Sequence, residues 1–553
     1  MPRPPLHTDV LVVGGGPVGL ALSLALRHHG VDHLVVERTD GTVGHPKVGT
    51  VGPRSMELFR RWGVAPALRA AGWPDDHPLD VAWVTAVGGH EILRLPFGTA
   101  AGRPLPDHTP EPDQVCPQHW LMPALLAAIG TRPRGPVGLG LRCDGIVRHD
   151  DRVTATVTDE ADGTSTTVEA AYVVACDGAA SPLRKACGVP APSYHRTRVF
   201  RNILFDAPEL RDRLGESAAL VHFLTAPGLL RYPLRAMDGR RMYRLTASAE
   251  SEEERAEDAM GLLRRAVAFD TPLTVLSDNT WHLTHRVAQS FRAGRVFFAG
   301  DAAHTLSPSG GFGMNTGIAD ADNLAWKLAA RLAGWAGPGL LDSYDTERRP
   351  VAEQSLDEAH ANMARTTRRA LPPEIASDTA EGERARAELA RRMEQGGVRR
   401  EFDAPDMAFG LRYDSPLIMN GGVGAGSDAG SDRADGTPDW RRGAVPGVRA
   451  PHAWLAPDRS TLDLFGRRYV LLTFDPTEPA VEARRAFAHH GVPLTVTPCA
   501  DPDVARRYAR PLVLVRPDGH VAWCGAELPA DTDTFVQRLR GAAPATATAP
   551  LWL

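Results

Sequence analysis

The sequence of 553 residues lacks several features that mark other classes of protein. It has six cysteines and no CxxC pair, so neither a disulfide framework nor a cysteine-bound metal is expected. The HExxH, Walker and GxSxG motifs are absent, which argues against a zinc protease, an NTPase and an α/β-hydrolase. No apolar run is long enough to span a bilayer, and the net charge of -5 offers no basic footprint for nucleic acid. We therefore expect a cytoplasmic protein with no bound metal and with neither a membrane nor a nucleic acid as partner.

The N-terminal segment has the pattern of a dinucleotide-binding βαβ unit. An apolar run over residues 8–13 predicts a buried strand, and the glycine motif Gly14–Gly19 and a helical pattern over 18–29 follow it. Residues 33–36 predict the next strand, which ends at Glu37, a residue suited to binding ribose hydroxyls. A tight strand–helix turn without a ligand is the less favoured alternative. Four residues of the motif are expected at a pyrophosphate: Gly14, Gly16, Pro17 and Gly19.

A second glycine-rich run, Gly300–Gly317, lies between a strand-like segment (295–299) and a helix-like one (314–332). Asp301, at the strand end, can accept hydrogen bonds from a ribityl hydroxyl. The turn 308–311 lets the backbone approach a flat ring closely, because glycine carries no Cβ atom. The helix N-terminus directs free N–H groups at the same place, which suits an anionic reduced flavin. This run predicts a flavin site, with a glycine-rich surface loop as the alternative.

A third block, 171–178, predicts a strand that ends in Asp177-Gly178, and Ser181 and Arg184 follow it. Alone, an Asp-Gly pair usually marks a turn. Beside the other two blocks it indicates a contact of Asp177 with the pyrophosphate side of the flavin, and Arg184 could help to place an incoming phosphate.

Together, residues 14–19, 175–184 and 298–330 resemble the single-component, FAD-dependent aromatic hydroxylases of the para-hydroxybenzoate hydroxylase fold. The resemblance is closest to the longer bacterial members that hydroxylate phenols and aromatic polyketides, and it covers nearly the whole chain. It implies an α/β fold with a Rossmann-like FAD-binding domain, an antiparallel-sheet substrate domain and a C-terminal thioredoxin-like domain. It also implies a monooxygenase: NAD(P)H reduces FAD, O2 forms a flavin C4a-hydroperoxide, and a phenolic substrate of the multi-ring polyketide type is hydroxylated, as in antibiotic biosynthesis.

The pattern along the chain predicts a split FAD-binding domain over 1–190 and 285–395, a β-rich substrate domain over 191–284, a linker over 396–440 and a thioredoxin-like domain over 441–553. The last has a β-α-β-β pattern closed by a helix, with strands at 469–474, 494–498, 512–515 and 521–523 and helices at 479–490 and 531–540. Because it lacks CxxC, we expect a structural role for it, for example at a homodimer interface.

The resemblance places further residues around FAD. Arg38 lies next to the adenine side or is simply a surface arginine, and Gln118 falls where the family uses a glutamine against the ribityl chain. Lys47 stands where the family commonly has arginine; it keeps the charge without the planar fork, so movement of the isoalloxazine could differ. The flavin ring is expected to contact Pro308 and Gly310, and backbone N–H groups at its pyrimidine end are expected from Gly313, Met314 and Asn315.

The substrate pocket is the part that the sequence defines least. Candidates from the β-rich section are Phe205, His222, Phe223, Arg231, Tyr232 and Pro233, although apolar residues of this kind are more often part of the core than of a pocket. His222, Arg231 or Tyr232 could deprotonate or orient a phenol, but no catalytic base is assigned. The same scaffold could instead perform Baeyer–Villiger insertion, epoxidation or oxidative rearrangement, or act as a flavin-binding dehydrogenase without oxygen insertion. The choice between NADPH and NADH stays open.

Overall fold

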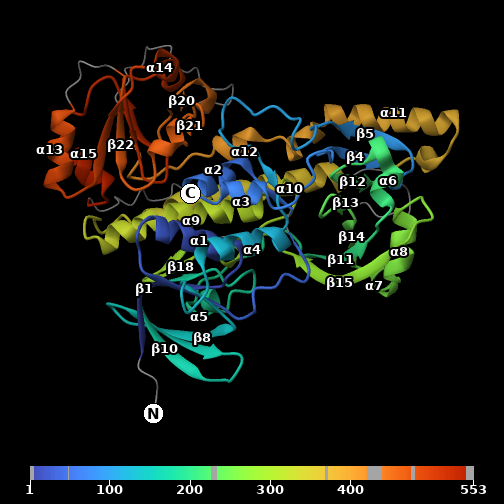
Figure 1. Cartoon of the computed structure of the whole chain (residues 1–553), viewed down its shortest axis with the longest axis horizontal. Helices are drawn as coiled ribbons and strands as arrows, with labels where there is room; N and C mark the ends of the chain where they lie inside the picture. The colour runs from blue at the N-terminus through green and yellow to red at the C-terminus, as the bar shows by residue number, and fades with distance from the viewer. Residues whose placement is uncertain are drawn as a thin grey trace, which may run out of the picture.

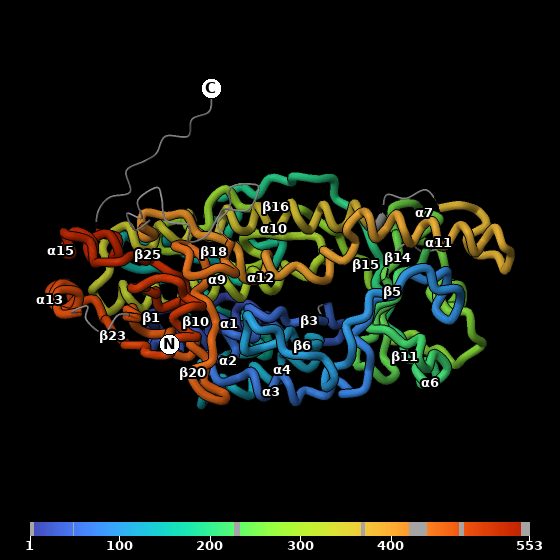
Figure 2. The backbone as a smooth tube through the Cα atoms, turned by 90° about the horizontal axis from the view of Figure 1, so that it is seen from above, coloured from blue at the N-terminus to red at the C-terminus, as the bar shows by residue number. Residues whose placement is uncertain are grey.

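The computed structural model describes residues 5–47, 49–225, 233–367, 371–419, 439–474 and 480–542. Three parts lie in a row along the long axis of the molecule (Figures 1 and 2). The part that contains β1 and α1 is central, the C-terminal residues form one end, and a seven-stranded sheet forms the other. Helices α9 (Phe312–Leu332) and α10 (Ser343–Thr367) pack together along the central part.

The central part is built on an eight-stranded sheet with the strand order β17-β18-β10-β1-β2-β7, extended by β9 and β8. Strand β1 pairs in parallel with β2 and β10, and β10 with β18, so the carboxyl ends of these strands share one edge. Val10, Leu11 and Val12 of β1 are completely buried, as expected for a strand covered on both faces. The strands are β1 (Leu6–Val13), β2 (His33–Glu37), β7 (Val137–Leu139), β8 (Leu141–Arg148), β9 (Val153–Asp159), β10 (Ser165–Ala175), β17 (Arg292–Ala293) and β18 (Val296–Phe298).

Helices cover this sheet and two short strand pairs lie beside it. The predicted strand–glycine–helix–strand order at the N-terminus is confirmed, as are the strand before Asp301 and the long helix after it. The helices are α1 (Pro17–His28), α2 (Pro53–Arg61), α3 (Ala65–Arg69), α4 (Gln118–Ile129), α5 (Pro182–Ala186), α9 and α10, and the short strands are β3 (Thr50–Val51) with β6 (Gln114–Val115) and β16 (Arg286–Val287) with β19 (His304–Thr305).

The seven-stranded sheet has the order β15-β11-β14-β13-β12-β4-β5. Its members are β4 (Val81–Val84), β5 (Glu91–Leu95), β11 (Arg198–Asp206), β12 (Val221–Leu224), β13 (Pro233–Ala236), β14 (Met242–Ser248) and β15 (Thr274–Leu283), with helices α6 (Leu210–Leu214), α7 (Glu252–Ala256), α8 (Ala259–Ala266) and α11 (Ala380–Gln395) around it. The β-rich section is therefore not confined to 191–284. The β4–β5 hairpin joins it by pairing in parallel with β12, more than 100 residues away in sequence, and local patterns do not reveal such pairing.

The strand register gives this sheet two distinct faces. Leu234 lies opposite Leu245, and both are completely buried in the core on one face. Arg235 lies opposite Arg244 and, because successive side chains alternate, on the other face. The two arginines donate hydrogen bonds to residues of the loop 46–50 of the central part. We call the face that carries these arginines the cleft face.

The C-terminal part is a four-stranded sheet of order β23-β22-β24-β25 with helices packed on it. The predicted strands and helices are confirmed, with β23 parallel to β22 and the other pairs antiparallel. The likeness to thioredoxin stays a prediction. The elements are β20 (Trp454–Ala456), β21 (Arg459–Ser460), β22 (Tyr469–Thr473), α13 (Val481–His489), β23 (Leu494–Pro498), α14 (Pro502–Tyr508), β24 (Leu512–Val515), β25 (Val521–Gly525) and α15 (Thr532–Leu539).

The segment predicted as a linker over 396–440 is partly a packed structure. Val398 is buried in the core of the seven-stranded sheet, and Phe409 of helix α12 (Pro405–Phe409) is buried against Trp440. Residues 420–438, which contain its Gly/Ser/Asp-rich stretch, lie outside the described residues.

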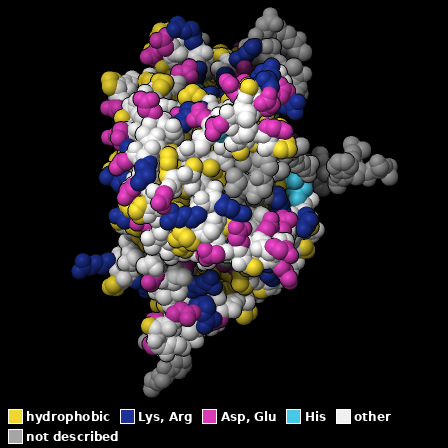
Figure 3. All heavy atoms as spheres, turned by 90° about the vertical axis from the view of Figure 1, so that its right-hand side faces the viewer, with side chains coloured by type: hydrophobic (Ala, Val, Ile, Leu, Met, Phe, Trp, Pro, Cys, Tyr) yellow, Lys and Arg dark blue, Asp and Glu magenta, His cyan; other side chains and the backbone are white. Residues whose placement is uncertain are grey.

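On the face shown in Figure 3, basic and acidic side chains are interspersed and hydrophobic ones are scattered between them. This face therefore presents no extended surface of one charge sign. Within the described ranges, no helix combines the length and the apolar character needed to cross a bilayer.

Candidate flavin and substrate site

The turn from β1 into α1 has the geometry of a phosphate cradle. Gly14 has a positive φ of 107°, and a Cβ atom on Gly19 would overlap the carbonyl oxygen of Gly14. These two glycines are therefore needed to bring strand and helix together. Gly16 differs, because a Cβ atom there would meet nothing within 4 Å. Gly16 caps α1 without a side-chain acceptor and Pro17 follows, so the N-terminus of the helix faces open space with free N–H groups.

Glu37, at the end of β2, holds the glycine turn from the other side. Its Oε2 atom accepts the N–H of Gly15 at 2.7 Å, and Oε1 accepts the backbone N–H of Thr39 at 2.9 Å and its hydroxyl at 2.8 Å. A carboxylate offers about four acceptor positions, so roughly one stays available for a ribose hydroxyl. Arg38 is exposed directly beside it. The predicted ribose role of Glu37 is compatible with this geometry, and the carboxylate also organises the turn.

Asp177 follows β10, which is adjacent to β1, and its carboxylate is only half satisfied. Oδ2 accepts the N–H of Leu183 at 3.1 Å, whereas Oδ1 is buried with no partner among the described residues. Burial raises the pKa of this carboxyl above its usual value. A buried oxygen of this kind is unfavourable unless a donor reaches it, as a hydroxyl or a water of a bound cofactor would.

Asp301 lies in the turn that follows β18. The residue is exposed to solvent, although many protein atoms surround its carboxylate. This partial burial raises the pKa of the carboxyl, whereas His304 and Lys47 act to lower it. We call the open space beside Asp301 and the first turn of α9 the recess. Asp320 of α9 fixes this turn, because its Oδ2 atom accepts the N–H of Gly300 at 3.0 Å.

Asp320 is itself fixed in a buried ion-pair network. Its Oδ2 lies 2.8 Å from His304 Nε2 and its Oδ1 accepts Arg348 Nε at 2.7 Å. Arg348 also donates to the carbonyl and hydroxyl of Thr316, both at 2.9 Å. Burial acts to raise the pKa of the Asp320 carboxyl, but Arg348 and His304 hold it below its usual range. The network therefore locks the first turns of α9 to the strand end that carries Asp301.

Helix α9 begins at the same place. Gly310 and Gly311 both have positive φ, at 88° and 68°, and Gly311 caps the helix without a side-chain acceptor. Beside Gly313, a Cβ atom would meet nothing within 4 Å, so open space adjoins the free N–H groups of the first turn. Met314 is buried in the core. The Asn315 side-chain amide accepts hydrogen bonds from Gly52 and Ser55 and donates one to the carbonyl of Gly311. The backbone of this turn, rather than the side chains of Met314 and Asn315, therefore adjoins open space, and Pro308 is exposed beside it.

The loop around Lys47 closes the recess toward the seven-stranded sheet. The N–H of Lys47 donates to Gln118 Oε1 at 3.0 Å, and its carbonyl accepts Arg244 Nη1 at 2.6 Å. The Lys47 side chain is exposed and close enough to Asp301 to affect the pKa of that carboxyl. Lys47 and Gln118 are therefore brought together, but through the lysine backbone, which leaves its ammonium group available.

These residues fit FAD. Two uncapped helix N-termini face open space beside glycine, as a diphosphate and the electron-rich end of a flavin require. Glu37, Asp177 and Asp301 supply acceptors for hydroxyl groups. The predicted cofactor-binding residues are assembled from β1, β2, β10, β18, α4 and α9 at the carboxyl edge of one sheet, the edge at which α/β folds bind their ligands. Their contacts with FAD stay predictions.

The predicted substrate residues do not all lie on the same face of the seven-stranded sheet. Phe205 lies opposite Tyr243, stacks on it and is completely buried in the core, and His222 is opposite Leu234. Both therefore point away from the cleft face, and assigning them to a substrate pocket was wrong. His222 is a buried core histidine whose Nε2 lies 3.2 Å from the carbonyl of Ser217, and burial lowers its pKa to about 4.

Phe223 lies on the cleft face, opposite Pro233, and stacks on Trp83 with ring centroids 5.2 Å apart. Because Phe223 is buried, its ring packs within the protein and is not exposed for contact with a substrate. Arg231 and Tyr232 lie outside the described residues.

Arg235 and Arg244 are the residues that sequence reasoning missed. Arg235 donates to Thr50 Oγ1 at 2.7 Å and Arg244 to two loop carbonyls, yet neither forms an ion pair with a carboxylate among the described residues. Both Nε atoms are buried without a partner in the same set. Burial, together with Arg244, lowers the pKa of Arg235 to about 10, and burial lowers that of Arg244 to about 10, so both stay charged at neutral pH. In the sequence, each of these arginines stands next to an apolar residue of its strand, Arg235 beside Leu234 and Arg244 beside Leu245. This alternation could have indicated that both arginines lie on the face opposite the core.

A separate cavity of about 190 Å³ lies in the C-terminal part, lined by residues such as Leu464, Val504 and Cys499. It shares no residue with the recess described above. Its small, mainly apolar lining has none of the acceptors and helix ends of the flavin site, so the chemistry is assigned to the recess.

Comparison with known proteins agrees with this geometry. Residues 7–359 match the family described as FAD binding domain, and residues 443–543 match the aromatic-ring hydroxylase C-terminal family. A putative polyketide hydroxylase of Streptomyces halstedii is 34% identical over 94% of this chain and 94% of its own.

Solved structures are similar over almost the whole chain. RebC soaked with chromopyrrolic acid, with 7-carboxy-K252c bound, has a TM-score of 0.92 and 58% identity, covering 98% of this chain and all of its own; another RebC structure was soaked with K252c. Aklavinone-11 hydroxylase in complex with FAD and aklavinone has a TM-score of 0.78 and 27% identity over 98% of this chain and all of its own.

Proposed function

The chain belongs to the FAD-dependent aromatic-ring hydroxylases, and we propose that its substrate is a multi-ring aromatic compound with a carboxylate, of the type named for RebC. The protein is an FAD-dependent monooxygenase. Bound FAD supplies the redox chemistry, taking electrons from NAD(P)H and activating O2, and the protein supplies position and electrostatics.

The observation that carries this proposal is the pair of arginines on the cleft face, Arg235 and Arg244, which form no ion pair with any carboxylate that the structure describes. Arg235 and Arg244 lie side by side and donate hydrogen bonds to Pro46, Lys47 and Thr50, and Lys47 is close enough to Asp301 to affect the pKa of that carboxyl. Two adjacent guanidinium groups without a carboxylate partner are costly to keep in a partly buried place. An anionic substrate would neutralise them and would be held by charge-assisted hydrogen bonds over the flavin recess.

The relatives support the same choice. RebC, at 58% identity, has 7-carboxy-K252c bound, a compound whose name specifies a carboxyl group, whereas the polyketide hydroxylase is 34% identical. By analogy, a carboxylated multi-ring substrate agrees with the more similar protein and with the charge on the cleft face.

In this arrangement each group has a defined task. Gly14, Gly16, Gly19 and the N-terminus of α1 would hold the diphosphate, and Glu37 would hold the ribose. The N-terminal turn of α9 would stabilise negative charge on the flavin. Arg235 and Arg244 would bind and orient the anionic substrate. His222 is not assigned as a base, because it points into the core.

The test compares 7-carboxy-K252c with K252c, which differ in name by one carboxyl group. Arg235→Met and Arg244→Met should weaken binding of 7-carboxy-K252c by roughly 10- to 100-fold, since hydrogen bonds to charged groups contribute about 1.5–3 kcal/mol, and should leave K252c almost unaffected. Arg241→Met is the matched control, because Arg241 is exposed and pairs with Asp206. Equal affinity of wild type and both variants for the carboxylated ligand would contradict the proposal.

A second candidate is hydroxylation of an aromatic polyketide, favoured by the named activities of the polyketide hydroxylase and of aklavinone-11 hydroxylase. Anaerobic reduction of the flavin by NADPH, repeated with aklavinone, 7-carboxy-K252c and no ligand, distinguishes the two. Faster reduction with aklavinone alone would favour the polyketide. Association into a homodimer stays a prediction, tested by light scattering.

A further inference from the structure

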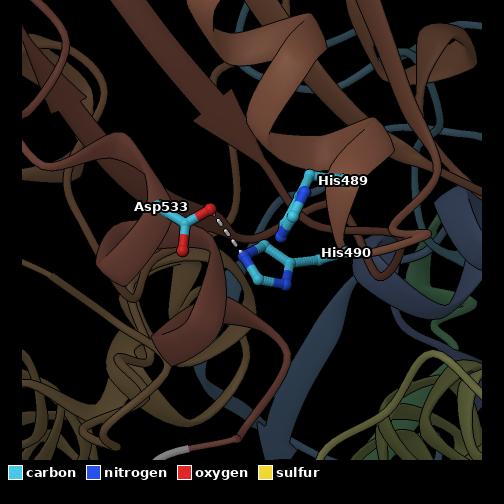
Figure 4. Close-up of side chains that lie close together, drawn as sticks. All are labelled: His489, His490 and Asp533. Carbon is cyan, nitrogen blue, oxygen red and sulfur yellow. Dashed lines mark hydrogen bonds and ion pairs between the residues drawn. The ribbon is translucent and has the colours of Figure 1, made fainter.

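A cluster of two histidines and one aspartate lies on the C-terminal part, remote in sequence from every residue of the flavin site. His489, His490 and Asp533 each offer one ligand atom, and these atoms all lie within 4.8 Å of one another. Figure 4 shows the two rings and the carboxylate directed toward a common point, with His490 Nε2 lying 2.9 Å from Asp533 Oδ1. Cysteine spacing and zinc motifs had predicted no metal, and neither criterion detects a cluster of this composition.

The end of α13 explains how adjacent histidines come to share one site. Side chains of consecutive residues on a continuing helix diverge by about 100° around its axis. His489 is the last residue of α13, and His490 is its cap, so the second ring leaves the helical path. Gly491 then adopts a positive φ of 65°, and the N–H of Val492 returns to the carbonyl of Phe487 at 2.9 Å. The rings meet edge to face with centroids 4.8 Å apart.

The third residue of the cluster comes from a different helix, α15, which packs against α13. Asp533 lies in the first turn of α15, whose cap Asp531 accepts the N–H of Thr534 at 2.9 Å. The two helices bury Phe487 and Phe535 in the same hydrophobic core. Both halves of the cluster are thus held by packed backbone, as a site for a small ion requires.

From this geometry we propose that His489, His490 and Asp533 bind a divalent transition-metal ion, with Zn²⁺ as the main candidate. Imidazole nitrogen and carboxylate oxygen are ligands that Zn²⁺ accepts at about 2.0–2.2 Å in a tetrahedral site. His489 and Asp533 are exposed, so water completes the fourth position. The ion joins the C-terminal end of α13 to the N-terminal end of α15 and stabilises this part of the chain.

The experiment uses the full chain without an affinity tag, loaded with FAD and freed of metal by a chelator. Titration with ZnCl2 in a calorimeter should show one saturable site per chain. His489→Ala, His490→Ala and Asp533→Asn should each weaken it by roughly 10- to 100-fold or more, since a lost ligand costs at least as much as a lost supporting partner. His149→Gln and Glu482→Gln are matched controls: His149 is an exposed histidine outside the cluster and Glu482 an exposed acid on α13.

Two further measurements separate a metal site from a purely structural role. Zinc X-ray absorption should report nitrogen and oxygen neighbours at about 2.0–2.1 Å, and Zn²⁺ should raise the unfolding temperature of wild type but not of Asp533→Asn. The FAD content of the variants should match wild type, because none of the three residues belongs to the flavin recess. Absence of saturable binding, or binding of wild-type strength in all three variants, would overturn the proposal.

Discussion

Replacing Arg516 should uncouple the C-terminal part from α9, the helix whose first turn adjoins the recess. Arg516 lies in the turn between β24 and β25 and is completely buried against α10. Its Nη1 donates to Glu347 Oε1 at 2.6 Å and its Nη2 to Glu347 Oε2 at 2.9 Å. Lys327 of α9 lies 2.8 Å from the same carboxylate, and Asp518 pairs with the other side of the guanidinium.

The magnitude follows from the burial. Although burial acts to raise it, Arg516 and Lys327 hold the pKa of Glu347 far below its usual range, so the pair is charged at neutral pH. Removing one partner of such a buried pair typically costs about 3–5 kcal/mol, because a charge is left without compensation. For Arg516→Met the stranded charge is Asp518, since burial lowers the pKa of the adjacent His520 to about 4 and keeps it neutral. Adding Asp518→Asn should restore roughly 0.5–3 kcal/mol.

The assay is urea unfolding at fixed FAD concentration, followed by tryptophan and flavin fluorescence. Arg516→Met should lower both midpoints, because α9 carries Lys327 near one end and, at the other, the turn that we propose binds the flavin. Arg441→Met is the control: the Arg441 side chain is 44% exposed and its Nη1 lies 3.1 Å from Asp406 Oδ1, so less than about 1 kcal/mol should be lost. A loss below 1 kcal/mol for Arg516→Met, or a further loss on adding Asp518→Asn, would refute the reasoning.

Three further predictions concern the recess and the sheet. If FAD occupies the open space beside Gly313, Gly313→Ala should leave apo-protein stability unchanged but weaken FAD binding by about tenfold, roughly 1.4 kcal/mol. Gly145→Ala, also beside open space, should leave FAD binding unchanged, and equal FAD affinity of the two variants would contradict the site. Asp320→Asn should strand the buried Arg348 and cost about 3–5 kcal/mol in thermal unfolding with loss of FAD, whereas wild-type behaviour would remove the network from the account. Burial lowers the pKa of His222 from 6.5 to about 4, so its contribution to stability is complete above pH 6.5 and falls by about 3 kcal/mol as the pH drops to 4. His222→Gln should therefore flatten the pH dependence of unfolding while keeping monooxygenase activity at neutral pH, and lost activity with an unchanged slope would indicate a catalytic role instead.

Much of the flavin recess could be predicted because its determinants are local. A glycine motif between an apolar strand and a helix permits one kind of turn, and the structure shows why Gly14 and Gly19 must be glycine there. Strand β2 occupies His33–Glu37, so the acid falls at the strand end as its spacing indicated. The β-α-β-β pattern of the C-terminal part was visible for the same reason.

The cleft face could not be predicted because it depends on non-local register. A shift of one residue in strand pairing moves every side chain to the opposite face, and the sequence does not fix the register of β12 against β13. His222 therefore looked like a candidate although it is buried, and Arg235 was overlooked. The Glu347–Arg516 pair joins residues 169 positions apart, a contact that composition and periodicity do not show.

The measurement that tests the central claim most directly is a single turnover under 18O2. The FAD-loaded enzyme, reduced anaerobically with NADPH, would be mixed with 7-carboxy-K252c and labelled oxygen, and the product analysed by mass spectrometry. One labelled oxygen atom in the product, with NADPH consumed in proportion, is the result that the account predicts. An unlabelled product, with the oxygen recovered as hydrogen peroxide, would contradict monooxygenation of this substrate class.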